Sequence, residues 1–250
     1  MCAAQHGYFD PTTPFQETDA DTSTDCLTQA QAFALRAMLA VVLAVAGPCA
    51  AAAAAQPAQH TSYWHERASF FRAFTSDAEV AMVGDSLTDG AEWGEMFPGR
   101  RIVNRGIDAD TTRGVLDRID GILAVHPARV FVMIGINDFA EEHRSVEAVF
   151  ADYKTLVSRL QQGGASVVVQ STLPCNVAKG AWKSCKALNP KIRELNARLA
   201  TLATGRTLFV SLSALVAADG GLRDDLTFDG VHLNGSGYRL WKEAIAPFLP

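Results

Sequence analysis

Short apolar runs alternate with amphipathic stretches along the chain after about residue 60. The apolar runs are brief and rich in β-branched residues, and they predict buried strands at 79–83, 101–104, 129–134, 166–170 and 207–210. Helical spacing between them predicts helices near Trp93, over 111–125, 146–161 and 190–203, and after Gly237. This alternation predicts an α/β fold in which helices cover both faces of a parallel sheet.

The ends of the first three predicted strands carry small and polar residues. The first strand leads into Gly84-Asp85-Ser86, the second into residues 105–110 and the third into residues 135–138. Ligands of such sheets bind beyond the carboxyl ends of the strands, near the point where the strand order reverses. We therefore expect the functional site at this edge.

Ser86 lies between the first strand and a helical stretch, so a helix N-terminus would favour negative charge near its hydroxyl. A serine hydroxyl needs a base to become a nucleophile, and capping of the helix is the alternative role. The sequence Asp229-Gly230-Val231-His232 is the only Asp-x-x-His of the chain. This spacing lets one turn aim the carboxylate at the imidazole, although His232 could instead be a structural histidine.

Acyl transfer also needs hydrogen-bond donors for the oxyanion of the tetrahedral intermediate, worth on the order of 3 kcal/mol each. Asn137 offers a side-chain amide, and the backbone N–H groups of Ser86 and of the loop near Ala109 offer two more. The alternatives are that Asn137 caps its own turn and that Asp138 is an ordinary helix N-cap.

Together these segments resemble the four motif blocks of the SGNH hydrolases, also called GDSL esterases and lipases. The matching segments are 84–87, 104–111, 135–138 and 229–232, and the resemblance spans roughly residues 79 to 248. It implies a three-layer α/β/α, flavodoxin-like fold with a five-stranded parallel sheet in the order 2-1-3-4-5. It implies no metal and no organic cofactor.

The resemblance also implies roles for single residues. Ser86 would be the nucleophile, His232 the general base and then acid, and Asp229 its orienting partner. Asn137 and the backbone N–H groups of Ser86 and Ala109 would form the oxyanion hole, with Asp85, Gly106 and Asp138 in supporting positions.

One position departs from the family pattern. The second block usually has a glycine where this chain has Ala109. A backbone donor survives that change, but a glycine with positive φ would not be replaced freely. We therefore expect either an ordinary backbone at Ala109 or a turn absorbed by Gly106.

Length and composition predict one domain. The chain has 250 residues, 48% of them hydrophobic, which is enough for one well-buried domain, assigned to 61–250.

Charge and missing motifs exclude several classes of function. A net charge of -5 without a Lys/Arg cluster argues against a nucleic-acid partner. The chain has no G-x-S-x-G elbow, phosphate-binding G-x-x-x-x-G-K-[ST] loop or H-E-x-x-H helix, and its other histidines lack ligand spacing.

The first 60 residues differ from the rest. Residues 1–36 read as a disordered leader or a mis-assigned start, because 1–35 are acidic and contain no Lys or Arg. Residues 37–58 read as a signal peptide, with an apolar run followed by small residues, so we expect a periplasmic or secreted protein. A membrane anchor is the alternative, but half of the run is Ala beside Pro48, so we expect no stable anchor.

Two cysteines remain in the predicted domain. Cys175 and Cys185 lie on one apparent loop, where they could form a disulfide in an oxidising compartment or remain free thiols.

The predicted substrate is a small-molecule or carbohydrate ester. Residues 90–93 and 104–112 resemble the acetylhydrolase-type branch of the family, which implies an acetyl ester on a carbohydrate. The alternatives are a broad arylesterase or thioesterase, a lysophospholipase-like acyl hydrolase, and a carbohydrate-binding relative without turnover. The oligomeric state is not predicted.

Overall fold

A single parallel sheet organises the part of the chain that the structure describes. The structure is a computed structural model, and it describes residues 60–179 and 184–250. The strands are β1 (Val80–Gly84), β2 (Ile102–Gly106), β3 (Arg129–Met133), β4 (Ser166–Gln170) and β5 (Thr207–Val210). They pair in parallel in the order β2-β1-β3-β4-β5, which confirms the predicted α/β class and strand order.

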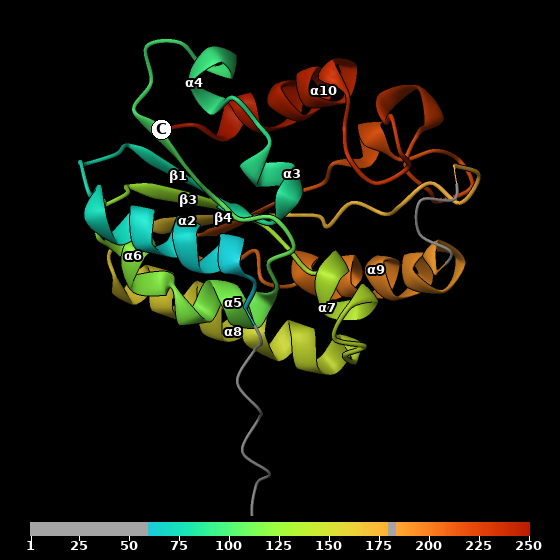
Figure 1. The fold of residues 1–250 in the computed structure, drawn as a ribbon, viewed down its shortest axis with the longest axis horizontal. Coiled ribbons are helices and arrows are strands. Elements are labelled where there is room, and N and C mark those ends of the chain that lie inside the picture. Colours follow the sequence, from blue (N-terminus) through green and yellow to red (C-terminus); the bar gives the residue numbers. More distant parts are fainter. Residues whose placement is uncertain (1–59, 180–183) are drawn as a thin grey trace, which may run out of the picture. The chain divides into compact units, whose positions relative to one another are not determined.

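Helices cover both faces of this sheet (Figure 1). One layer contains α2 (Ser62–Ala73), α5 (Thr112–Asp117), α6 (Ile119–Leu123), α8 (Val146–Gln162) and α9 (Cys185–Ala200). The other contains α3 (Ser86–Asp89), α4 (Trp93–Met96) and α10 (Gly235–Ile245), and α7 (Ile136–Ala140) follows β3. Three short 3₁₀ helices lie at Ser213–Leu215, Asp224–Leu226 and Ala246–Phe248. The result is the expected three-layer arrangement.

Alternating strand side chains supply two separate cores, because successive residues of a strand point to opposite faces. Val83, Val132 and Val169 pack in the core that includes α8 and α9. Met82 and Phe131 point to the opposite face, where Trp241 of α10 is fully buried. Both faces of the central strands are therefore covered, which fits their continuous apolar sequences.

The first described helix, α2, is not among the predicted elements. Its N-cap is Thr61, whose side chain accepts a hydrogen bond from the Trp64 N–H. Trp64, Ala68 and Phe71 are buried at helical spacing, but these three positions are too few to stand out from the polar residues around them.

Two predicted helices differ from the observed ones. The predicted helix over 111–125 is divided at Arg118, whose φ of -115° and ψ of 15° are not helical. The Arg118 side chain forms a buried ion pair with Asp110, and we attribute the break in the helix to this contact. Helix α9 begins at Cys185 rather than near Pro190, and contacts of Cys185 and Asn189 with residue 175 hold its first turn.

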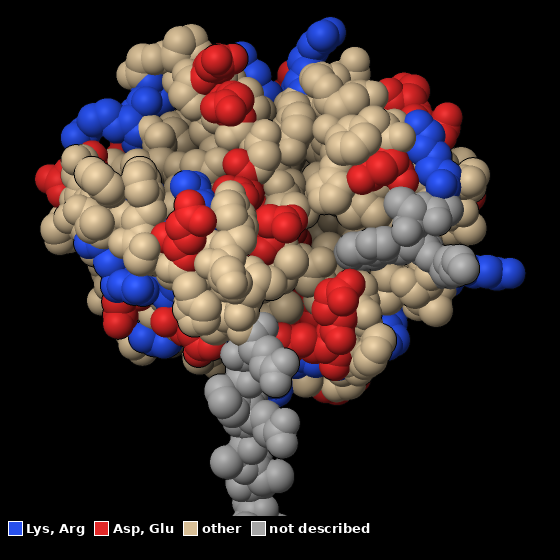
Figure 2. All heavy atoms as spheres, viewed as in Figure 1, with Lys and Arg blue, Asp and Glu red and all other residues tan. Residues whose placement is uncertain are grey.

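The predicted leader and signal peptide, residues 1–58, lie outside the described residues. Among the helices that the structure does describe, none combines the length and the apolar character needed to cross a membrane. On the face drawn in Figure 2, acidic and basic side chains are interspersed rather than gathered by sign.

Candidate active site

Ser86 is the first residue of α3, directly beyond the end of β1. Asp85 is the N-cap of this helix, and its carboxylate accepts a hydrogen bond from the Leu87 N–H at 3.2 Å. A Cβ on Gly84 would collide with the Thr88 hydroxyl and the Met133 carbonyl, so only glycine allows this tight turn from strand to helix. Asp85, and not Ser86, therefore performs the capping role.

Asp85 is buried without an oppositely charged partner that approaches it within hydrogen-bond distance. Burial raises the pKa of its carboxyl from 3.8 to about 7, while the Leu87 N–H acts in the opposite direction. The group directly before Ser86 thus changes its charge near neutral pH.

Ser86, His232 and Asp229 lie in one hydrogen-bonded series. The Oγ of Ser86 lies 3.0 Å from Nε2 of His232, and Nδ1 of His232 lies 2.7 Å from Oδ2 of Asp229. With the proton on Nδ1, the imidazole donates to Asp229 and can accept the proton of the serine hydroxyl. The structure thus brings Ser86 together with His232, which lies 146 positions further along the chain, and with Asp229, three residues before His232.

Asp229 is arranged to remain ionised. Burial alone would raise the pKa of its carboxyl, but hydrogen bonds from the His232 ring and from the Val231 and His232 N–H groups outweigh it, and the net pKa is lowered. These two N–H groups lie 2.8 and 2.7 Å from Oδ1. Oδ2 is left for the imidazole.

Ala109 adopts the left-handed conformation, with φ of 59°. Both expectations for this position are therefore wrong, because its backbone is not ordinary and Gly106 does not absorb the turn. The requirement for glycine at Gly106 is instead one of space, since a Cβ there would collide with the backbone of Thr88 and Asp89. The turn begins close to Ser86, where the Ile107 N–H donates to the Gly84 carbonyl at 3.1 Å.

Asn137 lies in α7, one residue after Ile136 and two after Gly135, whose φ is 125°. Its side chain is buried, and its Nδ2 donates to the Asp110 carbonyl at 2.9 Å. An amide nitrogen carries two N–H groups, so one donor remains after this bond. The contact joins Asn137 to the turn that contains Ala109.

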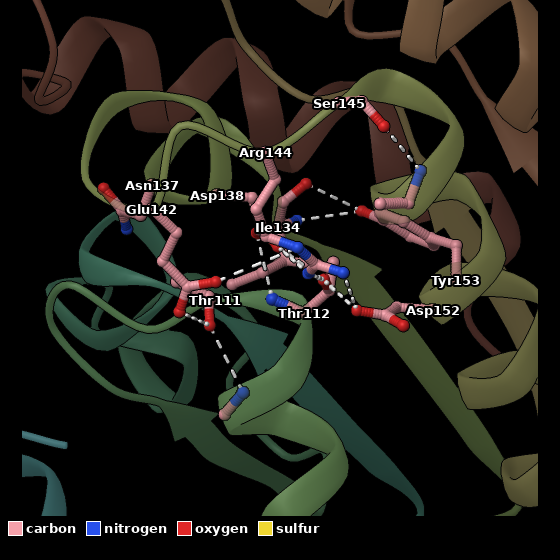
Figure 3. Close-up of polar contacts among 12 residues, drawn as sticks. Thr111, Thr112, Ile134, Asn137, Asp138, Glu142, Arg144, Ser145, Asp152 and Tyr153 are labelled. Atoms are coloured by element: carbon pink, nitrogen blue, oxygen red, sulfur yellow. Dashed lines mark hydrogen bonds and ion pairs between the residues drawn. The ribbon is translucent and has the colours of Figure 1, made fainter. Parts of the chain in front are cut away.

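Asp138 belongs to a buried polar cluster with Thr112, Arg144 and Asp152 (Figure 3). Its carboxylate accepts hydrogen bonds from the N–H of Thr112 at 3.0 Å, from the Thr112 hydroxyl at 2.5 Å and from Arg144 at 2.7 Å. Arg144 also contacts Asp152 at 2.6 Å. Asp138 is thus no ordinary N-cap, since it connects α7 to the first residue of α5.

Burial raises the pKa of the Asp138 carboxyl to about 6, although the Thr112 donors and Arg144 favour its charged form. Figure 3 shows Thr112, Arg144 and Asp152 converging on one another beside Asp138. The cluster therefore fixes the start of α5 against α7.

A second buried ion pair holds the other side of the turn. Arg118 donates from Nε to Asp110 at 2.7 Å and from Nη2 to the Gly84 carbonyl at 3.3 Å. The Trp64 indole of α2 donates to the same Asp110 carboxylate at 3.0 Å. Sequence reasoning missed Trp64, Asp110 and Arg118 as a set, because only the fold brings these distant residues together.

The structure joins Cys175 and Cys185 by a disulfide, with their Cα atoms 5.6 Å apart. Among the described residues, His, Cys, Asp and Glu side chains form no group of three suited to hold a metal ion.

Known proteins are similar to this chain in sequence and in fold. A family model described as the GDSL-like lipase/acylhydrolase family matches residues 82–240, well over half of the chain. Platelet-activating factor acetylhydrolase IB subunit alpha2 of Rattus norvegicus is 29% identical over 202 residues, covering 76% of this chain and 85% of that protein. The alpha1 subunit of the same species is 29% identical over 171 residues, covering 65% and 71% of the two chains.

Among solved structures, a GDSL-like lipase from Bacteroides thetaiotaomicron superposes with a TM-score of 0.66 and 24% identity, covering 74% of this chain and 96% of that one. The matched family segment contains the strand ends at Ser86, Ala109 and Asn137 together with Asp229 and His232. The chain belongs to the GDSL-like lipase/acylhydrolase family and is a carboxylic ester hydrolase.

Proposed function

We propose that the protein hydrolyses short-chain esters, acetyl esters first, through an acyl-enzyme on Ser86. The observation that carries this proposal is the series from Ser86 through His232 to Asp229, with distances of 3.0 and 2.7 Å. Such a series supplies a nucleophile, a base and a group that orients the base. The names of the curated relatives, which are acetylhydrolases, support acetyl as the acyl group.

In the first half of the reaction, the Ser86 oxygen attacks the ester carbonyl while Nε2 of His232 takes the hydroxyl proton. Asp229 holds the ring by its Nδ1–H and stabilises the imidazolium that forms. His232 then passes the proton to the leaving alcohol as the tetrahedral intermediate collapses. The acyl group remains on Ser86.

In the second half, water attacks the acyl-enzyme, and His232 accepts the proton of the water. The resulting tetrahedral intermediate releases the carboxylic acid as His232 returns the proton to the Ser86 oxygen. The N–H groups of Ser86 and Ala109 and the remaining amide donor of Asn137 are the proposed oxyanion hole in both halves. Hydrogen-bond donors stabilise an oxyanion best when they are held in position before the reaction. The hydrogen bond from Asn137 to the Asp110 carbonyl holds the Asn137 amide in this way, which supports the assignment.

We propose a carbohydrate as the alcohol portion of the ester. Phe228 is 68% exposed, and its ring lies nearly parallel to that of His232, with the centroids 6.0 Å apart. An exposed aromatic face beside the proposed general base suits an apolar ring face of a sugar. The acetylhydrolase-like segments at 90–93 and 104–112 point to the same substrate class.

Two assays test these proposals. We expect turnover of 4-nitrophenyl acetate, and covalent labelling of Ser86 by a serine-directed phosphonate located by peptide mass spectrometry. Absence of both would exclude the esterase mechanism and favour a carbohydrate-binding relative. Acetate release from acetylated polysaccharides and from acetylated sialic acids tests the alcohol portion, and turnover of aryl esters alone would exclude a carbohydrate ester.

We also propose that the protein is exported to the periplasm or the medium through a signal peptide at 37–58. The disulfide between Cys175 and Cys185 supports export, because disulfides persist mainly in oxidising compartments. Intact mass of the protein from the periplasmic and medium fractions measures the cleavage site. A full-length mass in the cytoplasmic fraction alone would contradict export.

A further inference from the structure

The loop that contains Asp229 and His232 is held by a neighbouring segment. The N–H of Asn176 donates to the Gly230 carbonyl at 2.7 Å, and Nζ of Lys179 donates to the Thr227 carbonyl at 2.6 Å. Gly230 has φ of 99°, and a Cβ there would lie 3.0 Å from the Cβ of Lys179 and 3.3 Å from the Asn176 carbonyl. The two segments therefore approach as closely as glycine allows.

Asn176 is buried and connects this contact to two other parts of the chain. Its Nδ2 donates to the Leu222 carbonyl at 2.8 Å. Its Oδ1 accepts hydrogen bonds from the N–H groups of Ala178 and Lys179, each at 2.9 Å. The side chain thus shapes the turn that presents Lys179 to the loop, and it fixes that turn to the segment ahead of the loop.

The residue before Asn176 is attached to helix α9 in three ways. Cys175 forms the disulfide with Cys185, the first residue of the helix. Asn189 of the same helix accepts a hydrogen bond from the Cys175 N–H at 3.0 Å and donates to the Cys175 carbonyl at 2.8 Å. Both cysteines are fully buried, so this attachment belongs to the core.

Helix α9 is itself a rigid base for these contacts. Leu188, Ile192, Leu195 and Leu199 are buried in the core that contains β3 and β4. A continuous path of contacts therefore runs from the core through Cys175 and Asn176 to Gly230. Gly230 directly follows Asp229 and lies two residues before His232.

We propose that Asn176, anchored by the Cys175–Cys185 disulfide and Asn189, is a positioning residue that fixes Asp229 and His232 relative to Ser86. The inference rests on the proposed roles of these three residues in ester hydrolysis. Gly230 is bonded to Asn176 on one side and adjoins Asp229 on the other, so a displacement of Asn176 moves the carboxylate. A weaker contact from Asp229 to His232 would stabilise less the imidazolium that forms during the reaction.

The test is the pH profile of kcat/KM for 4-nitrophenyl acetate in the full chain carrying Asn176→Ala. We expect kcat to fall by roughly 10- to 100-fold with little change in KM, since small misplacements of a catalytic group have effects of this size. We also expect the acidic limb of the profile to move to lower pH. A merely structural role would leave that limb unchanged.

Asn196→Ala is the matched control. Asn196 lies on α9 and bonds the backbone N–H and carbonyl of Thr172, each at 2.8 Å, as Asn189 bonds those of Cys175, but away from the His232 loop. We expect it to lower the thermal midpoint, as Asn176→Ala does, and to leave the acidic limb in place. An equal shift of the limb in both variants would overturn the proposal.

A second variant tests the same path with Asn176 intact. Cys175→Ala/Cys185→Ala removes the cross-link, and we expect a smaller fall in kcat with a shift of the acidic limb in the same direction. An unchanged pH profile in both this variant and Asn176→Ala would overturn the inference. Phosphonate labelling of Ser86 in the unaltered protein is measured alongside, and its failure would instead contradict the proposed function.

Discussion

The two sides of the candidate active site are held by different kinds of contact. The oxyanion side, residues 84–89, 106–112 and 135–138, depends on buried ion pairs, Asp110 with Arg118 and Asp138 with Arg144. The His232 loop, residues 227–233, is held mainly by hydrogen bonds to backbone carbonyls, close to a disulfide. The side proposed to stabilise the oxyanion is thus fixed by buried ion pairs, and the side proposed to transfer the proton is fixed mainly by hydrogen bonds to backbone carbonyls.

This difference has an electrostatic reason. On the oxyanion side, Asp110 and Asp138 are each paired with an arginine within hydrogen-bond distance, and such pairs fix direction strongly once they are buried, whereas the buried Asp85 has no such partner. An additional charge in contact with His232 would change the balance between the neutral and protonated forms of a ring proposed to act as both base and acid. The loop is held by the neutral N–H of Asn176 and by the Lys179 ammonium, which contacts the Thr227 carbonyl rather than the His232 ring.

The largest expected effect tests whether the two sides act as one unit. Ser86→Ala and His232→Ala should each lower kcat by about 10⁴- to 10⁶-fold, and the double variant should lose little more, because neither group works without the other. The measurement is kcat for 4-nitrophenyl acetate beside the thermal midpoint of each variant. Losses that multiply in the double variant would show that the two residues act independently.

The next effect is on stability and belongs to the oxyanion side. Arg144→Met leaves the buried Asp138 without its ionic partner and should lower the free energy of unfolding by about 3–5 kcal/mol. Asp138→Asn in addition should restore part of that loss, as measured by urea unfolding. Arg198→Met is the control, since Arg198 pairs at the exposed surface with Glu147 and Glu194, and it should change stability little.

A third prediction concerns pH. The folded protein binds the Asp85 proton more tightly than the unfolded chain, so this group's contribution to stability is fully present below about pH 4 and lost as the pH rises through about 7. Asp85→Asn removes that dependence and should gain stability relative to the unaltered protein at pH 8, by at most about 4 kcal/mol at 1.4 kcal/mol per pKa unit. Urea unfolding at pH 4 and pH 8 measures the difference, and parallel curves would contradict it.

The pKa of Asp229 shifts in the opposite direction, so its contribution is gained above the unfolded value and lost as the pH falls through the lowered folded value. Comparing Asp85→Asn with Asp229→Asn therefore separates the two sides by the sign of their pH dependence.

The smallest effect concerns Ala109. Its left-handed backbone costs an L-residue roughly 1–2 kcal/mol. Glycine would remove that cost, but the greater freedom of glycine in the unfolded chain would offset part of the gain in stability. Ala109→Gly should therefore stabilise the protein by about 0.5–1 kcal/mol with kcat little changed, since the donor is the backbone N–H. A large fall in kcat would show that the methyl group itself contacts the substrate.

Strand periodicity predicted the sheet, and short motifs placed Ser86 and Asn137 just beyond strand ends, because both are local signals. The strand order was implied by the resemblance to the SGNH hydrolases and not by the periodicity. The sequence did not predict the backbone of Ala109. The next residue, Asp110, is held by Trp64 of α2 and by Arg118, which lies between α5 and α6. Arg118 interrupts the apolar pattern of the predicted helix, but the sequence alone does not show that Asp110 is its partner.

The contacts of Asp138, on the other side of the turn, were likewise not predictable from the local sequence. Its place after Asn137 is typical of a helix cap, whereas its partners Thr112 and Arg144 become visible only once α5, α7 and the loop before α8 are packed together. Local sequence specifies which groups are polar, and packing decides which of them are buried together.

Because Cys175 and Cys185 form a disulfide, we expect the activity of the protein to depend on whether it is produced in an oxidising or a reducing compartment. Protein produced in a reducing cytoplasm would reach the same fold through its core while lacking the cross-link beneath the His232 loop. We expect such preparations to be soluble and folded yet to turn over more slowly than exported protein. The choice of expression host would then determine the measured activity as much as a substitution in the active site would.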